Sequence, residues 1–499
     1  MPQFRLREAS VFSRQVKTRM PFRFGRSTMT QMPILHLRLK VEADNGKMIT
    51  GVSASGIPPL WFDKAAGKTH ADNIQDLSIS LRLALDQYMQ LDEAPVWFLH
   101  KVAEPIIRKS AAAKGLNDLT AGFGVALTDS ALIDAACRHT GVTFHRALKE
   151  NILGYGADFA DMIPSAPLER IALRHTVGLV DPIFDGDITE PVNDGLPESL
   201  EQVVRHYRAQ YFKIKISGDA VESRDRLRRI ASVLDAQAGD YRATLDGNEQ
   251  FHDMVEFAAF IRDASRDPAL QNLWHRTLFI EQPVGRGHSL VDAVAEPLKE
   301  VDAFKPVIID ESDGSDESVV RALSLGYRGI SAKNCKGVFR TLHSYRMIKE
   351  LEAQGKPSPI LSSEDLTNAP IVPLHQDLCV AAALGIRHSE RNGHHYIIGF
   401  DFLTPKEKED ALREFPSLYR LREDEQGRET GSPVVRIEDG FISLKELNQT
   451  GFGTASEPDW ENLEPVRLPE VPADIITGEI PFIGHPLPED VIVDKRSAP

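Results

Sequence analysis

The chain has 499 residues, of which 42% are hydrophobic and 26% are charged; this is ordinary globular composition and excludes a disordered, collagen-like or disulfide-scaffold protein. A formal net charge of −15 disfavours a general nucleic-acid binder, which needs a basic surface. No run of about 18 apolar residues occurs, so we expect no transmembrane helix. Three widely spaced cysteines form neither a metal-spaced pair nor a disulfide framework, which favours a reducing, cytoplasmic location.

The first third of the sequence has the pattern of an α+β region. Residues 34–53 predict a β-hairpin that turns at Asp44-Asn45-Gly46. Apolar residues at helical spacing predict long helices over about 72–92, 99–113 and 127–150. The first 40 residues hold nine Lys or Arg and one acid, Glu8, which is typical either of a targeting segment or of a folded basic strand.

From about residue 170, short β-rich runs alternate with helical stretches, and this alternation favours parallel βαβ units. The eight runs are IALRHTVG, YFKIKIS, YRATLDG, TLFIEQP, PVIIDES, GISAKN, PILSSE and GIRHSE. Polar residues at their ends recur about every 30 residues, the length of one βαβ unit. Eight such strands predict a (β/α)₈ barrel with its active site at their C-terminal ends. A doubly wound sheet is the alternative, but its GxGxxG turn is missing.

Three successive runs, YRATLDG, TLFIEQP and PVIIDES, carry an acid where the strand ends: Asp246, Glu281 and Asp310. Carboxylates that converge from neighbouring barrel strands make a hard oxygen site, which suits Mg²⁺, with Mn²⁺ as a substitute. One such acid alone is more often a helix N-cap or a loop residue, but three in successive repeats favour a metal. Glu311, beside Asp310, is a second candidate for the third ligand, because one residue of register is not determined by the sequence.

Lysines end two other runs. Lys213 and Lys215 lie two apart on one strand and therefore share a face. Neighbouring ammonium groups lower each other's pKa, which predicts a usable base, although a snorkelling surface strand is the alternative for this pair alone. Lys333 ends a strand across the barrel. A lysine on each side of a carboxylate substrate fits removal of its α-proton, with a metal stabilising the enediolate.

These motifs, in this order, resemble the enolase superfamily, in its muconate-lactonizing and dipeptide-epimerase branch (mandelate racemase/muconate lactonizing enzyme-like). The motifs are Phe212-Lys213-Ile214-Lys215, Asp246-Gly247-Asn248, Glu281-Gln282-Pro283, Asp310-Glu311-Ser312 and Lys333-Asn334-Cys335-Lys336-Gly337. The resemblance covers nearly the whole chain. It implies opposed acid/base lysines at 215 and 333, and Mg²⁺ on the three acids.

The resemblance also implies a domain organisation. Residues 1–160 would form an α+β capping domain, 161–405 the α/β barrel, and 406–499 a C-terminal segment that returns to the cap. Residues 18–25 (TRMPFRFG) resemble the family's mobile loop after the first strand, so we expect a lid near 18–26. The last 45 residues hold eight prolines and ten acids, and we expect this tail to wrap the surface or to be partly disordered.

Specificity is expected at the ends of the last two barrel strands and in the lid. Glu364 and Glu390 end these strands and should both reach the barrel mouth. Dipeptide epimerases carry a DxD pair at the eighth strand, whereas this chain has Glu390-Arg391-Asn392 or Asp401-Phe402-Leu403. Arg19 or Arg23 would hold a second substrate carboxylate.

Two further groups complete the expected site. Lys336, with Lys213, would support it. A histidine-rich stretch, His388, His394 and His395, would either contact substrate or lie in a solvated loop.

We therefore expect a Mg²⁺-dependent enzyme that abstracts the α-proton of a small carboxylate, most simply a racemase or epimerase of an amino-acid derivative or dipeptide. A cycloisomerase or a syn-eliminating lyase of the same superfamily is the first alternative. A non-catalytic binding barrel is the second, and the intact lysines and acids argue against it. We expect no nucleic-acid or membrane partner, and a homo-oligomer.

Overall fold

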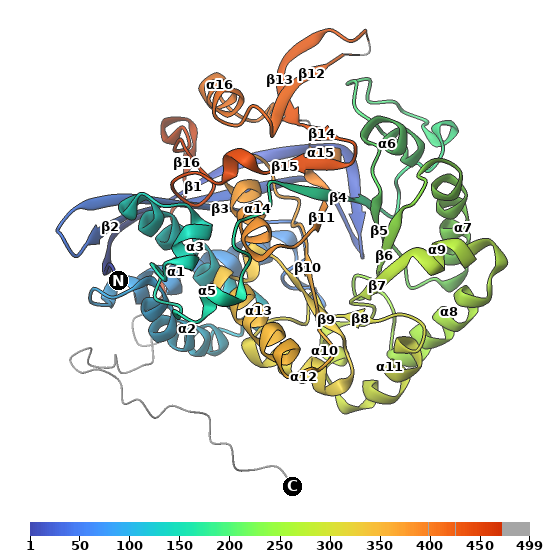
Figure 1. The fold of residues 1–499 in the computed structure, drawn as a ribbon, viewed down its shortest axis with the longest axis horizontal. Coiled ribbons are helices and arrows are strands. Elements are labelled where there is room, and N and C mark those ends of the chain that lie inside the picture. The colour runs from blue at the N-terminus through green and yellow to red at the C-terminus, as the bar shows by residue number, and fades with distance from the viewer. Residues whose placement is uncertain (398, 425, 472–499) are drawn as a thin grey trace.

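The structure is a computed structural model that describes residues 1–397, 399–424 and 426–471. It consists of an α/β barrel with a capping domain packed beside it (Figure 1). This confirms the expected fold class. The part of the acidic, proline-rich tail beyond residue 471 lies outside the described residues.

The capping domain is built on an antiparallel sheet of order β16-β1-β2-β3, consisting of β1 (Phe4–Phe24), β2 (Ser27–Ala43), β3 (Met48–Gly56) and β16 (Glu464–Pro465). The predicted hairpin corresponds to β2 and β3, which pair from Ile34↔Gly56 to Glu42↔Met48. The basic N-terminal segment is therefore a folded strand. Helices cover the sheet: α1 (His70–Gln90), α2 (Val96–Ala113), α3 (Asp118–Thr140) and α4 (Phe144–Lys149).

The expected lid near 18–26 is not a loop. Residues 18–24 continue β1, and Gly25, at φ +52°, turns the chain directly into β2. The pairing of β1 with β2 is irregular between Leu6 and Glu8 and between Lys17 and Phe22. Thr18 bridges to Ile397, and Leu179 donates to the Arg23 carbonyl, so the tip of this hairpin is joined to barrel loops.

The helix predicted over 127–150 begins and ends elsewhere. Asn117 caps the start of α3, and Gly141, at φ +69°, ends it before Thr143 caps α4. Gly122 and Gly124 obscure the helical pattern in the sequence, yet a glycine is needed here, because a Cβ on Gly124 would lie 2.2 Å from the Ser80 carbonyl oxygen. Among the described residues, α3 is the one helix long and apolar enough to cross a membrane, and it is entirely buried inside the protein.

All eight predicted barrel strands are present: β4 (Arg170–Val177), β5 (Tyr211–Lys215), β6 (Arg242–Asp246), β7 (Thr277–Glu281), β8 (Val307–Ile308), β9 (Gly329–Ala332), β10 (Ile360–Ser363) and β11 (His388–Arg391). They run parallel in the order β8-β7-β6-β5-β4-β11-β10-β9, and a bridge between Ile309 and Ile330 closes the ring. The C-terminal ends of all the strands therefore meet at one mouth.

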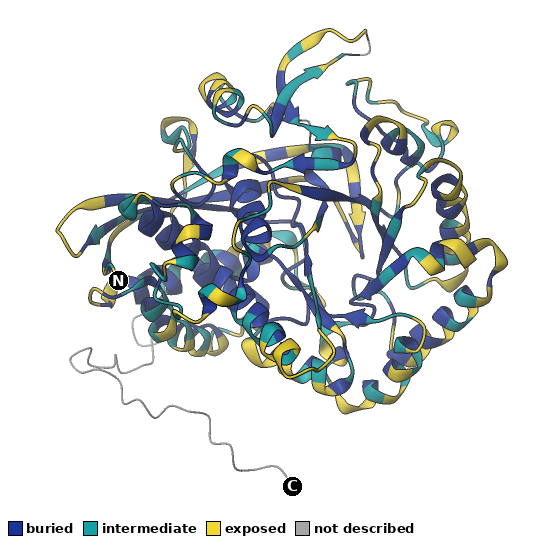
Figure 2. Cartoon of the chain, viewed as in Figure 1, coloured by how far each residue is buried: buried dark blue, intermediate teal, exposed yellow. Residues whose placement is uncertain are grey.

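Helices surround this ring, with their apolar faces turned inward and their polar faces exposed (Figure 2). They are α6 (Leu200–Tyr207), α7 (Ala220–Gln237), α8 (Met254–Arg266), α9 (Gln271–Arg276), α10 (Arg286–Ser289), α11 (Ala295–Asp302), α12 (Asp316–Leu325), α13 (Val338–Ala353) and α14 (Val372–Leu384). Short helices α5 (Phe159–Met162) and α15 (Gly393–Tyr396) precede and follow the strand ring.

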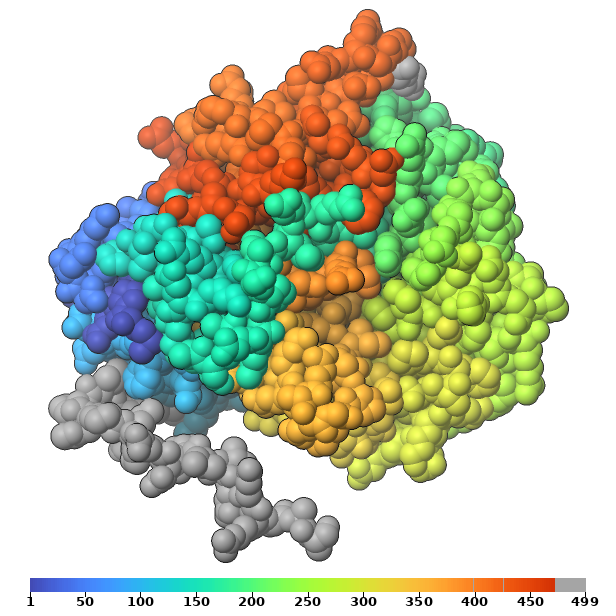
Figure 3. All heavy atoms as spheres, viewed as in Figure 1, coloured from blue at the N-terminus to red at the C-terminus, as the bar shows by residue number. Residues whose placement is uncertain are grey.

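The C-terminal segment contacts the capping domain. It contains α16 (Pro405–Glu414), β12 (Tyr419–Glu423), β13 (Glu429–Val435), β14 (Ile437–Glu438) and β15 (Phe441–Ser443). It then lies across both parts of the molecule (Figure 3). Phe452 packs on Phe144 with ring centroids 4.5 Å apart and the rings tilted by 36°, and its backbone N–H donates to Asp134 at 2.8 Å.

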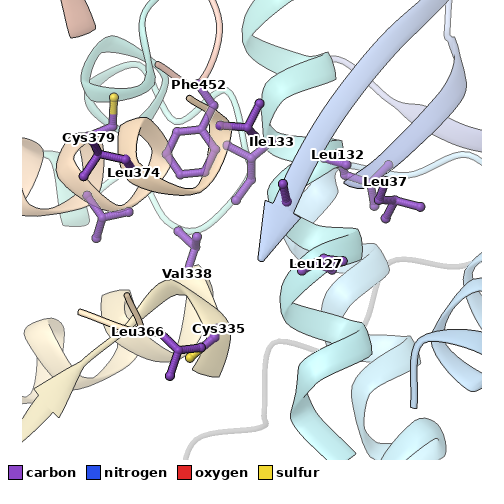
Figure 4. Close-up of a cluster of buried hydrophobic side chains, with 14 of the residues drawn as sticks. Leu37, Leu127, Leu132, Ile133, Cys335, Val338, Leu366, Leu374, Cys379 and Phe452 are labelled. Atoms are coloured by element: carbon purple, nitrogen blue, oxygen red, sulfur yellow. The ribbon is translucent and has the colours of Figure 1, made fainter. Parts of the chain in front are cut away.

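One hydrophobic core joins the two parts. Figure 4 shows side chains of β2, α3, the start of α13, α14 and the C-terminal segment meeting in it. Because Leu37, Cys335 and Phe452 come from three regions of the sequence and are each at most 5% exposed, the cap and the barrel pack as one unit.

Close packing of α3 on β3 gives a first prediction. A Cβ on Gly51 would lie 2.0 Å from the Ala131 carbonyl oxygen and 2.9 Å from the Ala135 Cβ, so Gly51→Ala forces the helix from the sheet. We expect a loss of about 2 kcal/mol or more in the free energy of unfolding. Chemical denaturation measures it. Gly186→Ala is the matched control, since no atom lies within 4 Å of its Cβ; equal stability of the two variants would contradict the prediction.

Candidate active site

Three carboxylates end three consecutive strands. Asp246 and Glu281 are the last residues of β6 and β7, and Asp310 follows β8 by two residues. Their side chains are at most 2% exposed. The structure thus brings together the three acids that the sequence singled out as metal ligands.

Lys213, on β5, lies at the centre of a group of four carboxylates. Its Nζ is 2.6 Å from Glu281 Oε2, 2.6 Å from Glu364 Oε2, 2.9 Å from Glu390 Oε2 and 3.0 Å from Asp246 Oδ2. The ammonium group therefore bridges acids from four different strands.

The other lysines each contact one side of this group. Lys215 Nζ donates to Asp246 Oδ2 at 2.6 Å, and Lys333 Nζ is 2.7 Å from Asp310 Oδ2. Lys336 Nζ is 3.0 Å from Asp310 Oδ1 and donates to the Asp310 carbonyl at 2.7 Å. Since β5 and β9 lie four strands apart in a ring of eight, Lys215 and Lys333 approach the mouth from opposite sides.

We expected the two neighbouring ammonium groups to lower each other's pKa, and this prediction is wrong for Lys213. Burial alone would lower the pKa of its ammonium, but the four surrounding carboxylates outweigh burial and hold it well above its ordinary value. Burial would also lower the pKa of Lys333, but Asp310 and Glu281 outweigh it, so this pKa is raised as well. Both lysines are therefore protonated in this arrangement.

The acids respond in opposite directions. Burial and the neighbouring carboxylates Asp246 and Glu364 hold the pKa of Glu281 well above its usual range. For Asp310, burial is outweighed by Lys333 and Lys336, and its pKa lies well below that range. Like charges are thus crowded most strongly around Glu281.

Crowded carboxylates are favourable to a divalent cation, which would neutralise their charge. Within residues 1–397, 399–424 and 426–471, no group of three His, Cys, Asp or Glu side chains is arranged to hold a metal as it stands, because ammonium groups lie between the acids. The donor set nevertheless fits a hard cation. Neither carboxylate oxygen of Glu281 has a hydrogen-bond partner, and its ionic contact with Lys213 is one that a metal could replace.

Glu311, the second candidate for the third ligand, is turned away from this group. Its Oε1 accepts from Lys64 Nζ at 3.0 Å and from Asn248 Nδ2 at 3.3 Å. Lys64 also contacts Glu249 at 2.6 Å, and Arg286 donates to the Trp61 and Phe62 carbonyls. Glu311 therefore helps to attach the segment after β3 to the barrel, and Asp310 is the better placed ligand.

A cavity with about 340 Å³ of empty space opens above these groups. Its floor is formed by Lys213, Lys215, Asp310, Lys333 and Glu390. Its walls are mostly apolar and come from both domains: Phe22, Phe24, Pro58, Trp61 and Leu366. Lys333 Nζ lies 5.3 Å from the centre of the Trp61 ring, a cation–π contact across the domain boundary.

Neither arginine expected in the lid lines this cavity. The Arg19 side chain is completely buried; it pairs with Asp194 at 2.6 Å and donates to the carbonyls of Leu196, Pro197 and His395. Arg23 is exposed, because it alternates with the inward-facing Phe22 and Phe24 on the same strand. The structure thus does not place a lid arginine against a substrate.

The two acids at the last strand ends lie at different depths. Glu390 lines the cavity, accepting from Thr176 Oγ1 at 2.8 Å, and Asn392 lines it as well. Glu364 does not; it is completely buried and bound by Arg174, Ser362 and Lys213. The expectation that both acids reach the mouth is therefore wrong for Glu364.

The histidine-rich stretch is not a solvated loop and does not line the cavity. His395 is 1% exposed, and His175 Nδ1 lies 3.1 Å from His394 Nε2. The ring of His175 packs on both neighbours, with centroids 5.3 Å and 4.8 Å away. His388 accepts from Arg174 at 3.0 Å. His175, His394 and His395 thus pack together, whereas the His388 ring stacks on Tyr211.

Sequence reasoning missed several cavity residues. Phe22 and Phe24 were present in the segment assigned to the lid, and their alternation with Arg23 was the signal that could have identified them. Trp61 and Asp365 carried no such signal. Asp365 follows Glu364 and accepts from the backbone N–H groups of Asn368 at 2.8 Å and Asn392 at 2.9 Å.

Comparison with known proteins supports the fold. No sequence-family model matches the chain, and no curated protein matches it in sequence. Solved structures do match it. An N-succinyl Arg/Lys racemase from Bacillus cereus is 15% identical with a TM-score of 0.55, and the match covers 95% of this chain and 97% of that one.

Two other solved structures match the chain over a similar share of its length. A muconate lactonizing enzyme from Pseudomonas fluorescens, complexed with muconolactone, is 16% identical over 92% of this chain and 97% of its own, with a TM-score of 0.56. A dipeptide epimerase from Enterococcus faecalis, complexed with Mg and the dipeptide L-Leu-L-Tyr, is 15% identical over 90% of this chain and 99% of its own, also at 0.56. The chain thus shares the fold of these structures, a barrel with a capping domain, which is the fold that its motifs indicated.

Asp365 gives a prediction for pH dependence. Burial raises its pKa to about 6, although Arg391 opposes the shift. The folded protein thus binds this proton more tightly than the unfolded chain, whose aspartates titrate near pH 4. The stabilisation from this group is complete below about pH 4 and is lost as the pH rises through about 6.

The asparagine side chain of the Asp365→Asn variant cannot ionise. The variant should therefore gain stability relative to the wild type as the pH rises from 4 to 7. Urea denaturation at half-unit pH steps measures this difference, and a fixed offset from altered hydrogen bonds does not affect its slope. A difference that stays constant across the range would contradict the prediction.

Proposed function

We propose that the protein catalyses Mg²⁺-dependent abstraction of the α-proton of a small carboxylate, and that it returns the proton on the opposite face as a racemase or epimerase. The observation that carries the proposal is the position of Lys215 and Lys333. They come from strands four apart in the ring of eight and line one cavity, with Asp246, Glu281 and Asp310 on the strands between them. A substrate α-carbon between the two ammonium groups would face a lysine on either side.

The residues of the chain then have separate roles. One of the two lysines, unprotonated, removes the α-proton, and the other, protonated, supplies a proton to the opposite face. Asp310 holds Lys333 in its protonated form, as the raised pKa of that lysine indicates. Lys213 lies between the acids and steadies the negative charge around them. The aromatic wall from the cap limits the access of water to the reacting atoms.

Asp246, Glu281 and Asp310 are the residues that would hold Mg²⁺. When bound, the metal would supply electrostatic stabilisation of the enediolate that forms when the α-proton leaves. The crowded, poorly bonded carboxylate of Glu281 supports this assignment.

The cavity wall supports a particular substrate class. No arginine lines the described cavity, and its lysines already contact acids, so a second carboxylate at the far end of the substrate has no partner there. Phe22, Phe24 and Trp61 instead offer an apolar surface. Asn248 Oδ1 and Asn392 Oδ1 are buried without hydrogen-bond partners and could accept from a substrate N–H. An amino-acid derivative with an apolar side chain satisfies both features.

A cycloisomerase or a syn-eliminating lyase remains the chemical alternative, in which only one lysine transfers a proton. We favour the two-base reaction because both lysines line the same cavity. A cytoplasmic location, proposed from the cysteine pattern, is in keeping with three free, buried thiols.

Proton exchange tests the two-base mechanism. With Mg²⁺ in D₂O, a panel of dipeptides, N-acyl amino acids and 2-hydroxy acids should show α-proton exchange for at least one member, with apolar side chains preferred over anionic ones of equal size. Lys215→Ala should lose exchange from one enantiomer first and Lys333→Ala from the other, and both should lose racemisation. NMR of the α-proton measures this. Equal residual exchange from both enantiomers in both variants would rule out opposed bases.

Metal binding tests the ligand assignment separately. Asp246→Asn removes one of three anionic ligands and should weaken Mn²⁺ binding by about tenfold or more, as measured by isothermal titration. Glu407→Gln, which alters a buried acid of the C-terminal segment, is the control and should bind Mn²⁺ like the wild type. Unchanged affinity in Asp246→Asn would remove this residue from the metal site.

A further inference from the structure

Beneath the cavity lies a buried arginine that the proposed chemistry does not use. Arg174, on β4, is completely buried inside the barrel and does not line the cavity. Its Nη2 donates to the Glu364 carboxylate, to Ser362 Oγ at 2.8 Å and to the Ser363 carbonyl at 3.1 Å. Burying an arginine here requires a strong counterpart, and Glu364 is that counterpart.

The contacts around Arg174 keep it in one orientation. Its Nη1 lies 3.0 Å from His388 Nδ1, and its guanidinium lies 5.3 Å from the centre of the Phe279 ring. Burial lowers the pKa of His388 to about 3, so this ring is neutral and accepts the hydrogen bond. Arg174 therefore presents a fixed positive charge to Glu364.

Glu364 connects Arg174 to the cluster at the mouth. One of its carboxylate oxygens, Oε1, is bound by Arg174, and the other, Oε2, accepts from Lys213 Nζ at 2.6 Å. The same Nζ is 2.6 Å from Glu281 and 3.0 Å from Asp246. Glu364 on one side and the two proposed metal ligands on the other thus compete for one ammonium group.

We propose that Arg174 is a positioning residue that acts through Glu364 on Lys213, and so sets how strongly Lys213 neutralises Asp246 and Glu281. This inference rests on the proposed function, because it concerns the acids assigned to the metal. By neutralising Glu364, Arg174 leaves the charge of Lys213 directed at Asp246 and Glu281. Without Arg174, Glu364 would draw Lys213 away from them.

Removal of Arg174 and removal of the Glu364 charge should change Mn²⁺ affinity in opposite directions. Arg174→Gln should tighten Mn²⁺ binding by about tenfold, because Lys213 shifts toward Glu364 and competes less for the ligands. Glu364→Gln should weaken it by about tenfold, because Lys213 is then shared only with the remaining acids. The double variant should bind Mn²⁺ within about threefold of Glu364→Gln, because Arg174 has no effect on Lys213 once the Glu364 charge is gone. Arg174→Lys, which keeps the charge, should stay within about threefold of the wild type.

Isothermal titration with Mn²⁺ and thermal unfolding of the metal-free protein are the two readouts. Arg14→Gln is the matched control, because Arg14, on β1, forms a buried pair at 2.9 Å with Glu407 of the C-terminal segment. It should lower the unfolding midpoint without changing Mn²⁺ affinity. A purely structural role for Arg174 would weaken Mn²⁺ binding in both single variants, and that result, or no change in either, would overturn the inference.

If Arg174→Gln does not fold, the double variant decides: it should fold and bind Mn²⁺ within about threefold of Glu364→Gln, and its failure to do so overturns the inference. If the wild type binds no Mn²⁺, the proposed function fails, and thermal unfolding decides the inference alone. Arg174→Gln and Lys213→Met, whose side chains are linked through Glu364, should then show non-additive effects, whereas additive effects would overturn it.

Discussion

Charge compensation inside the barrel is the constraint on which the rest of the structure depends. Five carboxylates, each at most 1% exposed, gather there: Asp246, Glu281, Asp310, Glu364 and Glu390. Removing a carboxylate from water costs several kcal/mol, and short contacts with cations must offset that cost. Lys213 contacts four of these acids, so the position of β5 governs the geometry of β6, β7, β10 and β11 at once.

The capping domain makes this cluster effective by covering it. The tip of β1 and the segment after β3 place Phe22, Phe24 and Trp61 over the mouth. Lys64 and Arg286 hold that segment on the barrel through Glu249 and Glu311. Because an apolar cover lowers the local dielectric, each ionic contact beneath it becomes stronger, and so does the penalty for an unpaired charge.

The barrel could be predicted from the sequence because each strand is a short apolar run that ends in a polar residue, and this pattern is local. The three acids and the lysines could be singled out for the same reason. The predictions that were wrong concern side chains whose partners are distant in the sequence. Arg19 has the chemistry of a carboxylate-binding residue, yet Asp194 occupies it. Glu364 ends a strand like Glu390, yet Arg174 draws it below the mouth, and nothing in the run IALRHTVG indicates that its arginine points inward.

The charges of the cluster also explain how Lys333, whose pKa is raised, could act as a base. Five cationic side chains, Lys213, Lys215, Lys333, Lys336 and Arg174, contact the five buried acids. A divalent cation among these acids would leave an excess of positive charge and favour the loss of a lysine proton. A carboxylate substrate then restores neutrality, and transfer of its α-proton to the free lysine leaves the total charge unchanged. The acids that hold the lysines protonated are thus the same groups through which a bound metal would release one of them.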